Sequence, residues 1–340
     1  MLPQYLVRAR AWWFNKVPLS VTLVLLLLDG TVLTVPAVLT VVLVVLTVCA
    51  VGNYGYALNE LYDVEEDARA KRSNAVGALG RRRVTLIIVT SALAAELLAT
   101  VAAGAWGAAL TFIELLLPLV YSVPPLRIKE RKWLGLAADA LAAHVYPAAL
   151  ALLTVRHFGV SHAPALLSAC VLTWSAAVGI RGILSHQLHT AERDRQGGLT
   201  TVVHDFGPLP LERFITFALL PIEAAGFIGA VAACGGGPIL WGLGTLYLAS
   251  EAFRTLHGGF VVIVLRPEGQ RYLPFVEEGF YKAWGPIVVA LDAARVDLAY
   301  LFFIPLYAWW FKPHLVAEEA KLRAIARALR SWAARPDRAA

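Results

Sequence analysis

The chain has 340 residues, of which 59% are hydrophobic and 16% charged, and its mean hydropathy is +0.65. These values exclude an ordinary soluble protein of this length and predict an all-α polytopic membrane protein. The net charge is +6, and the bases gather in loops and at the C-terminus. In a membrane protein this pattern indicates cytoplasmic loops and contact with anionic lipid rather than nucleic acid. The three cysteines show no metal-binding spacing, which argues against a disulfide framework or a zinc site.

Apolar stretches of membrane length recur along the chain. Residues 3–16 mix aromatic and basic side chains and predict an interfacial helix or the approach to the first span, which is expected to be retained and to cover 17–34. Further spans are expected at 35–62, 84–103, 106–122, 133–155, 163–189, 211–233, 237–264 and 285–311. The sequence thus predicts about nine transmembrane helices around a central cavity, in a single domain over residues 1–311.

A basic amphipathic tail is expected at 312–340, with a helix over about 314–333. With nine spans, the loops after spans two, four, six and eight share one face and carry the bases. The positive-inside rule makes that face cytoplasmic, and we expect a prokaryotic plasma membrane. The basic tail would then fall on the opposite side, against the charge rule. Either an extra pass is hidden, within about 237–265, or the tail lies on the outer leaflet.

The first polar block, NELYDVEEDARAKR at 59–72, closes the second span. Asn59, Asp63 and Asp67 are spaced i, i+4, i+8, so a helix places all three side chains on one face. A solvated helix end would explain the acids, but it would explain their shared face less well. Acids at the end of a membrane-length helix, with bases just beyond, suit Mg²⁺ and a diphosphate.

Two more polar blocks end spans four and six on the same predicted face: YSVPPLRIK at 121–129 and SHQLHTAERDRQGGLTT at 185–201. Carboxylates can hold Mg²⁺, and Arg and Lys can hold the remaining phosphate charge. Within the spans, Asp292 and Arg295 are spaced i, i+3, which predicts a local ion pair. Asp139 lies in the span after the second block and is a candidate for lining the cavity.

These motifs carry a resemblance. NELYDVEED is similar to the NxxxDxxxD signature of the UbiA superfamily of intramembrane prenyltransferases, and YSVPPLRIK is similar to its YSxPPxRxK segment. The AERDRQGGLTT stretch resembles the second acidic motif of that superfamily, DxxDxEGDRxxGxxT. The resemblance spans residues 59–201 and implies a magnesium-dependent membrane transferase of isoprenoid biosynthesis.

The resemblance also implies roles for individual residues. Asn59, Asp63 and Asp67 would bind Mg²⁺ that bridges the diphosphate of an isoprenyl donor. The phosphate oxygens would be bound by Lys71 or Arg72, with Arg127 and Lys129. Tyr121 would lie near the ionising carbon or a phosphate. Asp194 keeps the last acid of the second motif, and Gly198 and Thr201 keep its later landmarks.

The third block departs from the superfamily pattern. Gln187 and Thr190 stand where two earlier acids are common, and Thr200 stands in place of a base. Asp194 could hold one metal ion with Gln187 or Glu192, but a second fully acidic site is in doubt. His186, Thr190 and Asp194 share a helical face. Two interpretations stay open: His186 binds a metal ion or abstracts a proton, or these residues form a hydrogen-bonded helix end without a catalytic role.

Three functions remain open from the sequence. The first is transfer of a prenyl cation from an isoprenyl diphosphate to an aromatic or lipid-like acceptor of unknown identity. The second is a terpene cyclase of the same superfamily, in which the double bonds of the donor trap the cation. A transporter with an acidic cation site is the third, but it gives YSVPPLRIK no purpose and no inverted repeat is evident.

Overall fold

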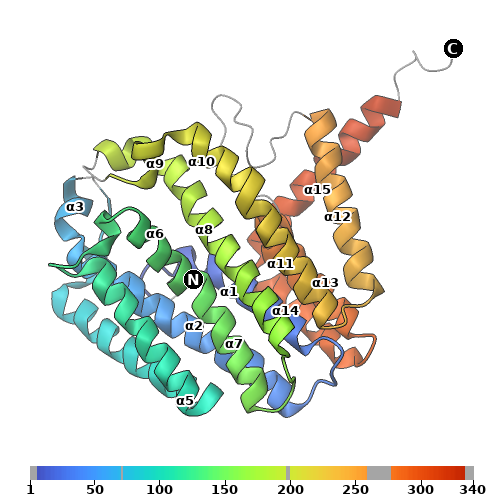
Figure 1. Cartoon of the computed structure of the whole chain (residues 1–340), viewed down its shortest axis with the longest axis horizontal. Coiled ribbons are helices and arrows are strands. Elements are labelled where there is room, and N and C mark those ends of the chain that lie inside the picture. Colours follow the sequence, from blue (N-terminus) through green and yellow to red (C-terminus); the bar gives the residue numbers. More distant parts are fainter. Residues whose placement is uncertain (1–5, 70–71, 197–199, 259–276, 334–340) are drawn as a thin grey trace.

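A computed structural model describes residues 6–69, 72–196, 200–258 and 277–333. Over these residues the chain is a bundle of helices without a β-strand (Figure 1). This confirms the predicted all-α membrane fold. Five helical stretches within the described ranges are long and apolar enough to cross a membrane, and two shorter ones are also apolar, so the predicted count of nine spans is not confirmed.

The helices lie in this order along the chain. Their bounds are α1 Ala9–Leu28, α2 Val35–Tyr62, α3 Val64–Arg69, α4 Ala75–Leu79, α5 Arg81–Ser122, η1 Ile128–Glu130, α6 Trp133–Ala140, η2 Leu141–Val145, α7 Tyr146–His157, α8 Ala165–Gln196, α9 Val202–Phe206, α10 Pro208–Phe214, η3 Ile215–Leu219, α11 Leu220–Ala233, α12 Pro238–Gly258, η4 Glu277–Trp284, α13 Gly285–Ala293, η5 Leu298–Phe302, α14 Phe303–Trp310 and α15 Lys312–Ala333. The segments η2, η3 and η4 are π-helical, whereas η1 and η5 are 3₁₀-helical.

The predicted third and fourth spans are the two halves of α5. The backbone leaves the helical region at Ala103 and Gly104, where the chain bends. Gly104 has φ 62°, a left-handed conformation that glycine adopts without the steric cost of a Cβ atom. The turn expected between residues 103 and 106 is therefore present, and its position is set by this glycine.

The ninth predicted span, 285–311, is wrong as a single crossing. The helix α13 ends at Ala293, a turn follows, and η5 and α14 run back beside α13. The Tyr307 hydroxyl at the end of α14 accordingly bonds the carbonyl of Lys282, just before α13 begins. A hidden pass at about 237–265 was one of the two alternatives expected, whereas the reversal lies at 294–297.

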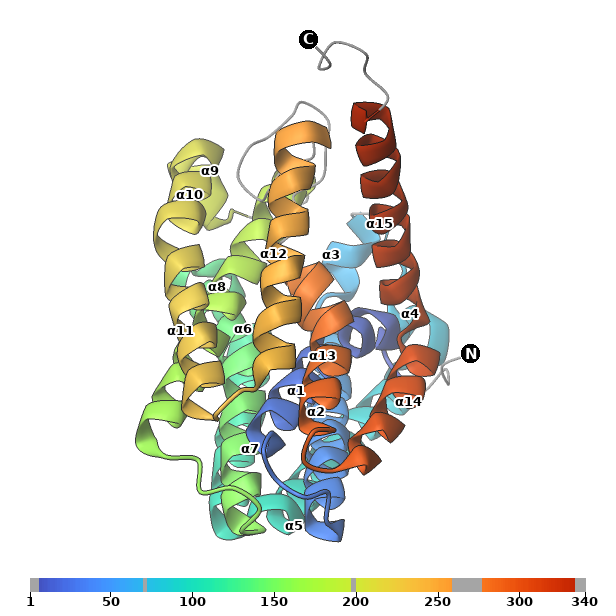
Figure 2. The same cartoon turned by 90° about the vertical axis from the view of Figure 1, so that its right-hand side faces the viewer.

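This reversal decides where the C-terminal helix goes. The helix α15 runs back along the bundle, and α12 and α15 end at the same side as α9 and α10 (Figure 2). Inside the bundle, Glu318 of α15 accepts a hydrogen bond from Trp284 Nε1 at 3.2 Å. The alternative of a tail on the far side of the bundle is therefore also wrong.

The main apolar core joins α1, α2, α5, α7, α8 and α13. Membrane helices associate by close packing, and small residues at their interfaces allow it. Gly226 shows this for α11 and α8, because a Cβ atom there would lie 2.7 Å from the backbone nitrogen of Trp174. At the far end, the buried Asp292 pairs with Arg295 at 3.1 Å, as predicted, and accepts from the N–H of Gly237 at the start of α12 at 2.5 Å. These contacts hold α11 against α8 and the end of α13 against the start of α12.

Candidate functional site

The first polar block forms the junction of α2 and α3. Asp63 is the C-terminal cap of α2, with φ −99° and ψ 10°, and α3 starts at the next residue. The backbone nitrogen of Asp63 bonds the carbonyl of Asn59 at 2.9 Å, and the nitrogen of Asp67 bonds the carbonyl of Asp63 at 2.8 Å. The helix is thus interrupted, but Asn59, Asp63 and Asp67 still follow one another at one-turn spacing. The one-turn backbone spacing is therefore kept without one continuous helix.

The second block brings its bases to the first. Arg127 donates to Asp63 Oδ1 at 3.4 Å and also pairs with Glu66. Lys129 pairs with Asp63 and donates to Glu66 Oε2 at 2.9 Å. All four side chains are largely buried. Two carboxylates and two bases from blocks that are about sixty residues apart therefore form one cluster.

Burial and the neighbouring bases change the pKa of the Asp63 carboxyl in opposite directions. Burial raises the pKa of the Asp63 carboxyl above its ordinary value, and the negative charge of Glu66 adds to this. The hydrogen bond and charge of Lys129, and the charge of Arg127, lower the same pKa without cancelling the effect of burial. Asp63 is therefore a carboxyl whose ionised form gains from an additional cation.

Asp67 points to a different set of partners. Asn74 donates to Asp67 Oδ2 at 2.7 Å, and the Arg8 guanidinium lies 3.6 Å from the same oxygen. Arg8 also pairs with Glu60, whose side chain is 2% exposed. Asn59, by contrast, accepts from the Ser122 hydroxyl at 3.2 Å and so faces the end of α5. The structure brings Asn59 and Asp63 to the second block and joins Asp67 to the N-terminal segment.

The third block reaches the first through its last acid. Asp194 lies 3.9 Å from the Arg72 guanidinium and accepts from the Thr190 hydroxyl at 2.6 Å. Gln187, Thr190 and Asp194 lie at helical spacing on α8, and Gln187 Oε1 is buried with no hydrogen-bond partner among the described residues. Asp194 thus stands beside one predicted phosphate-binding base.

Glu192 is placed differently from the prediction. Its carboxylate is 65% exposed and pairs with Arg195 at 3.2 Å. His186 and His189 are exposed as well. Glu192 lies on another face of α8 from Asp194, because two residues turn a helix by about 200°. The structure does not bring Glu192 to the acids of the first block.

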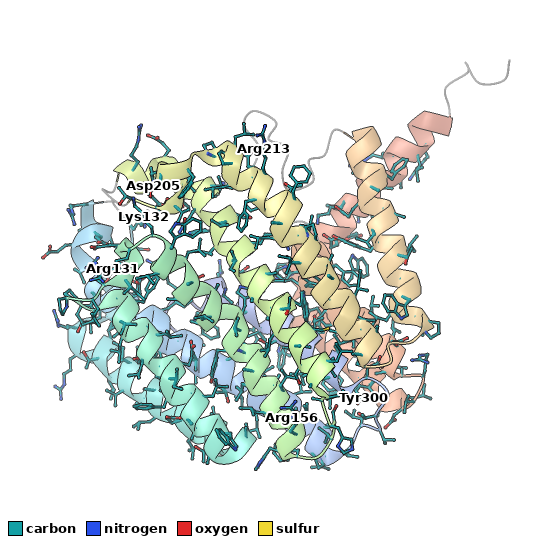
Figure 3. All side chains as sticks on the ribbon, in the orientation of Figure 1. Arg131, Lys132, Arg156, Asp205, Arg213 and Tyr300 are labelled. Carbon is teal, nitrogen blue, oxygen red and sulfur yellow. The ribbon has the colours of Figure 1, made fainter. Side chains whose placement is uncertain are left out.

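Tyr121 lies at the end of α5, next to Ser122, which donates to Asn59. Lys71, one alternative to Arg72 for phosphate binding, and Gly198 lie outside the described residues. Arg131, Lys132, Asp205 and Arg213 mark this end of the bundle, and Arg156 and Tyr300 mark the opposite end (Figure 3).

The oxygen atoms of this site fit a magnesium ion in kind. Mg²⁺ prefers carboxylate and amide oxygens and is commonly held by one or two carboxylates plus phosphates. Asn59, Asp63, Gln187 and Asp194 supply such oxygens, and one of them, Gln187 Oε1, is buried and unused. Within the described ranges, no three His, Cys, Asp or Glu side chains are grouped as a complete metal site. Phosphate oxygens would therefore have to complete the coordination.

Sequence reasoning missed several members of the cluster. Glu66 could have been found, because it is three residues from Asp63 and so shares its helical face. Arg8 and Asn74 carry no such signal. Their contacts with Glu60 and Asp67 depend on how the N-terminal segment and the loop at 72–75 fold back over the first block.

Comparison with known proteins agrees with the fold and the motifs. No curated protein matches the sequence. Among solved structures, a UbiA homologue from Archaeoglobus fulgidus bound to GPP and Mg²⁺ is similar, with 18% identity and a TM-score of 0.56 over 88% of this chain and 99% of that one. An apo UbiA homologue from Aeropyrum pernix K1 has 20% identity and a TM-score of 0.57, over 86% of this chain and 100% of that one. A digeranylgeranylglyceryl phosphate synthase has 13% identity and a TM-score of 0.53, over 87% and 96%.

At these identities the structural matches establish the fold alone. The family model described as the UbiA prenyltransferase family matches residues 17–258, which is more than half of the chain and includes all three polar blocks. The chain therefore belongs to the UbiA prenyltransferase family.

Proposed function

We propose that this protein is a Mg²⁺-dependent intramembrane enzyme that ionises an isoprenyl diphosphate and transfers the prenyl cation to an aromatic or lipid-like acceptor. The observation that carries this proposal is the meeting of Asp63 and Glu66 with Arg127 and Lys129 at one end of an apolar bundle. In such a cluster the ion pairs can open, so that the carboxylates bind a metal ion and the bases bind a diphosphate. Similar structures with GPP and Mg²⁺ support this donor class.

The reaction follows from the residues of the site. Arg127 and Lys129 would leave the carboxylates and bind diphosphate oxygens by charge-assisted hydrogen bonds. Asn59, Asp63 and Asp194, with Gln187, would hold Mg²⁺. When bound, the ion would stabilise charge on the diphosphate as the carbon–oxygen bond breaks. Tyr121, at the end of α5, would stabilise an allylic cation through its ring, while the apolar interior would exclude water.

Diphosphate release tests the donor half of this proposal. The purified protein in lipid nanodiscs is mixed with GPP, with Mg²⁺ or with EDTA, and inorganic diphosphate is measured. We expect release only with Mg²⁺ and near-complete loss in Asp63→Ala. Lys132→Ala is the matched control, because Lys132 is a base of the same region that pairs with Asp205 at the surface. Diphosphate release that persists in EDTA would refute the proposal and return the transporter to consideration.

The cyclase is the second candidate, and the altered third block favours it. Gln187 and Thr190 replace two acids there, and Thr190 is engaged by Asp194. Product analysis with the donor alone separates the two functions. A cyclic hydrocarbon would establish the cyclase, whereas simple hydrolysis without an acceptor, and a prenylated product with one, would establish transfer.

A further inference from the structure

Two carboxyls of the first polar block are more deeply buried than the acids that meet the second block. The side chains of Glu60 and Asp67 are 2% and 5% exposed. Those of Asp63 and Glu66 are 11% and 21% exposed. A buried carboxylate is normally paired with a cation or hydrogen-bonded, because an isolated buried charge is costly. Glu60 and Asp67 have partners of both kinds.

The cation between these two carboxyls is Arg8. Its guanidinium pairs with Glu60 through Nε, and its Nη2 lies 3.6 Å from Asp67 Oδ2. The Asn74 amide donates to Asp67 Oδ2 at 2.7 Å and to the Glu60 carbonyl at 2.9 Å. The backbone N–H of Ala75 donates to Glu60 Oε2. Three of the four carboxylate oxygens therefore already have a donor within the protein.

Arg8 is held in this position by contacts of its own segment. The N–H of Val7 donates to Asn53 Oδ1 at 2.8 Å, and the carbonyl of Val7 accepts from Trp12 Nε1 at 2.9 Å. Both Val7 and Trp12 are buried. Arg8 itself has φ 45°, a left-handed conformation that a residue other than glycine keeps only where its surroundings hold it. The backbone thus fixes where the guanidinium begins.

These anchors distinguish Arg8 from the bases of the second block. Arg127 precedes the short helix η1 and Lys129 lies within it, and both pair with acids that are partly open to solvent. Turning Arg8 away would instead leave Glu60 and Asp67, both almost fully buried, without their cation. Removing one partner of a buried ion pair is strongly destabilising. Opening the contacts therefore costs more for Arg8 than for either base of the second block.

We propose that the Arg8 guanidinium takes the place of a metal ion between Glu60 and Asp67, so that Asp67 does not ligate Mg²⁺. This rests on the proposed function, because it concerns the charge of the same site. In the first block, Asn59 and Asp63 remain as ligands for Mg²⁺, and Arg8 supplies a fixed positive charge one turn away. A fixed cation reduces the repulsion between Asp67 and a diphosphate without a second ion from solution.

Counting bound ions tests this assignment without the reaction. The full-length protein in nanodiscs of zwitterionic lipid is dialysed against Mn²⁺, which suits the same oxygen ligands as Mg²⁺. Bound ions are counted with and without geranyl thiolodiphosphate, an unreactive analogue of the donor. Arg8→Gln frees Glu60 and Asp67 for an ion and should bind one more Mn²⁺ per chain than the wild type. Adding Asp67→Asn to Arg8→Gln should remove that additional ion.

Three single variants serve as controls. Arg8→Lys keeps a positive charge and should bind no additional ion. Arg10→Gln removes an exposed base two residues away and should match the wild type. Asp67→Asn keeps Arg8 and should bind Mn²⁺ with the analogue as the wild type does, whereas loss of a true ligand would weaken this binding by about tenfold or more. This variant tests the assignment even if Arg8→Gln does not fold, which thermal unfolding of each variant shows.

Two results would overturn the assignment while leaving the proposed function intact. One is a folded Arg8→Gln variant that binds no additional ion, and the other is weakened Mn²⁺ binding by Asp67→Asn. Absence of Mg²⁺-dependent diphosphate release from the wild type would instead overturn the proposed function. The ion count of Arg8→Gln without the analogue does not depend on that release, so the two failures are distinguishable.

Discussion

Replacing Lys129 by alanine should affect donor and metal binding in opposite directions. Lys129 donates to Glu66 at 2.9 Å and pairs with Asp63, and its side chain is 9% exposed. In the loaded site it would bind a phosphate oxygen. Loss of one charge-assisted hydrogen bond costs about 1.5–3 kcal/mol. The Michaelis constant for GPP should therefore rise about 10- to 150-fold.

The same change removes a cation that competes with Mg²⁺ for Asp63. Two unit charges 4 Å apart interact by about 4 kcal/mol at an effective dielectric constant of 20. Even a third of this energy would tighten binding of Mg²⁺ alone by about tenfold. Calorimetry with Mg²⁺ in the absence of donor, and steady-state kinetics with GPP, measure the two effects separately. Weaker binding of both, or an unchanged Michaelis constant, would refute the internal exchange of ion pairs.

Three other changes test the surroundings of the site and the fold. Burial raises the pKa of the Asp63 carboxyl in the folded protein, so folding loses free energy as pH rises through that pKa and the carboxyl ionises. Asp63→Asn should therefore gain stability relative to the wild type between acid and neutral pH, while losing activity. Unfolding of both proteins at pH 4 and pH 7 measures this difference. Arg8→Ala leaves two buried carboxylates without their guanidinium and should cost about 1–3 kcal/mol in the same assay; no loss would mean that the N-terminal contact is unimportant. Gly226→Ala places a Cβ atom 2.7 Å from the backbone nitrogen of Trp174 and should cost about 1–3 kcal/mol, whereas Gly242→Ala, which meets nothing within 4 Å, should be neutral or stabilising; equal effects would contradict the described packing.

Local spacing predicted much of the site. The i, i+4 pattern of Asn59 and Asp63 survives a helix break because both backbone bonds across it keep helical spacing. The bases of YSVPPLRIK were expected to meet these acids, and the structure brings them together. The contacts of Arg8 could not be predicted, because no periodic pattern relates a residue before the first helix to the end of the second.

The missed reversal shows where hydropathy loses information. Residues 285–311 form an apolar run with three charged residues, Asp292, Arg295 and Asp297. Charges in a span were interpreted as a local ion pair, and that pair is present. Asp297 has a further role, since its side chain accepts from the backbone nitrogen of Ala299 at 2.9 Å and caps the returning helix. A capping aspartate inside an apolar run was the available signal for a turn.

The same turn alters how the charges of the chain are counted. Because α14 brings the chain back, the C-terminal part of α15 ends at the same side of the bundle as α9 and α10 (Figure 2). This part of α15 carries the exposed bases Arg323, Arg327 and Arg330. Arg131 and Lys132 lie at the same end as Asp205 of α9 (Figure 3). The start of α1 is at this end too, since Arg8 contacts the first block. The described helices therefore begin and end on the same side of the bundle, and the bases of α15 no longer contradict the charge rule. If the turn at 294–297 were straightened into a continuous helix, every base beyond it would lie on the opposite side of the bundle.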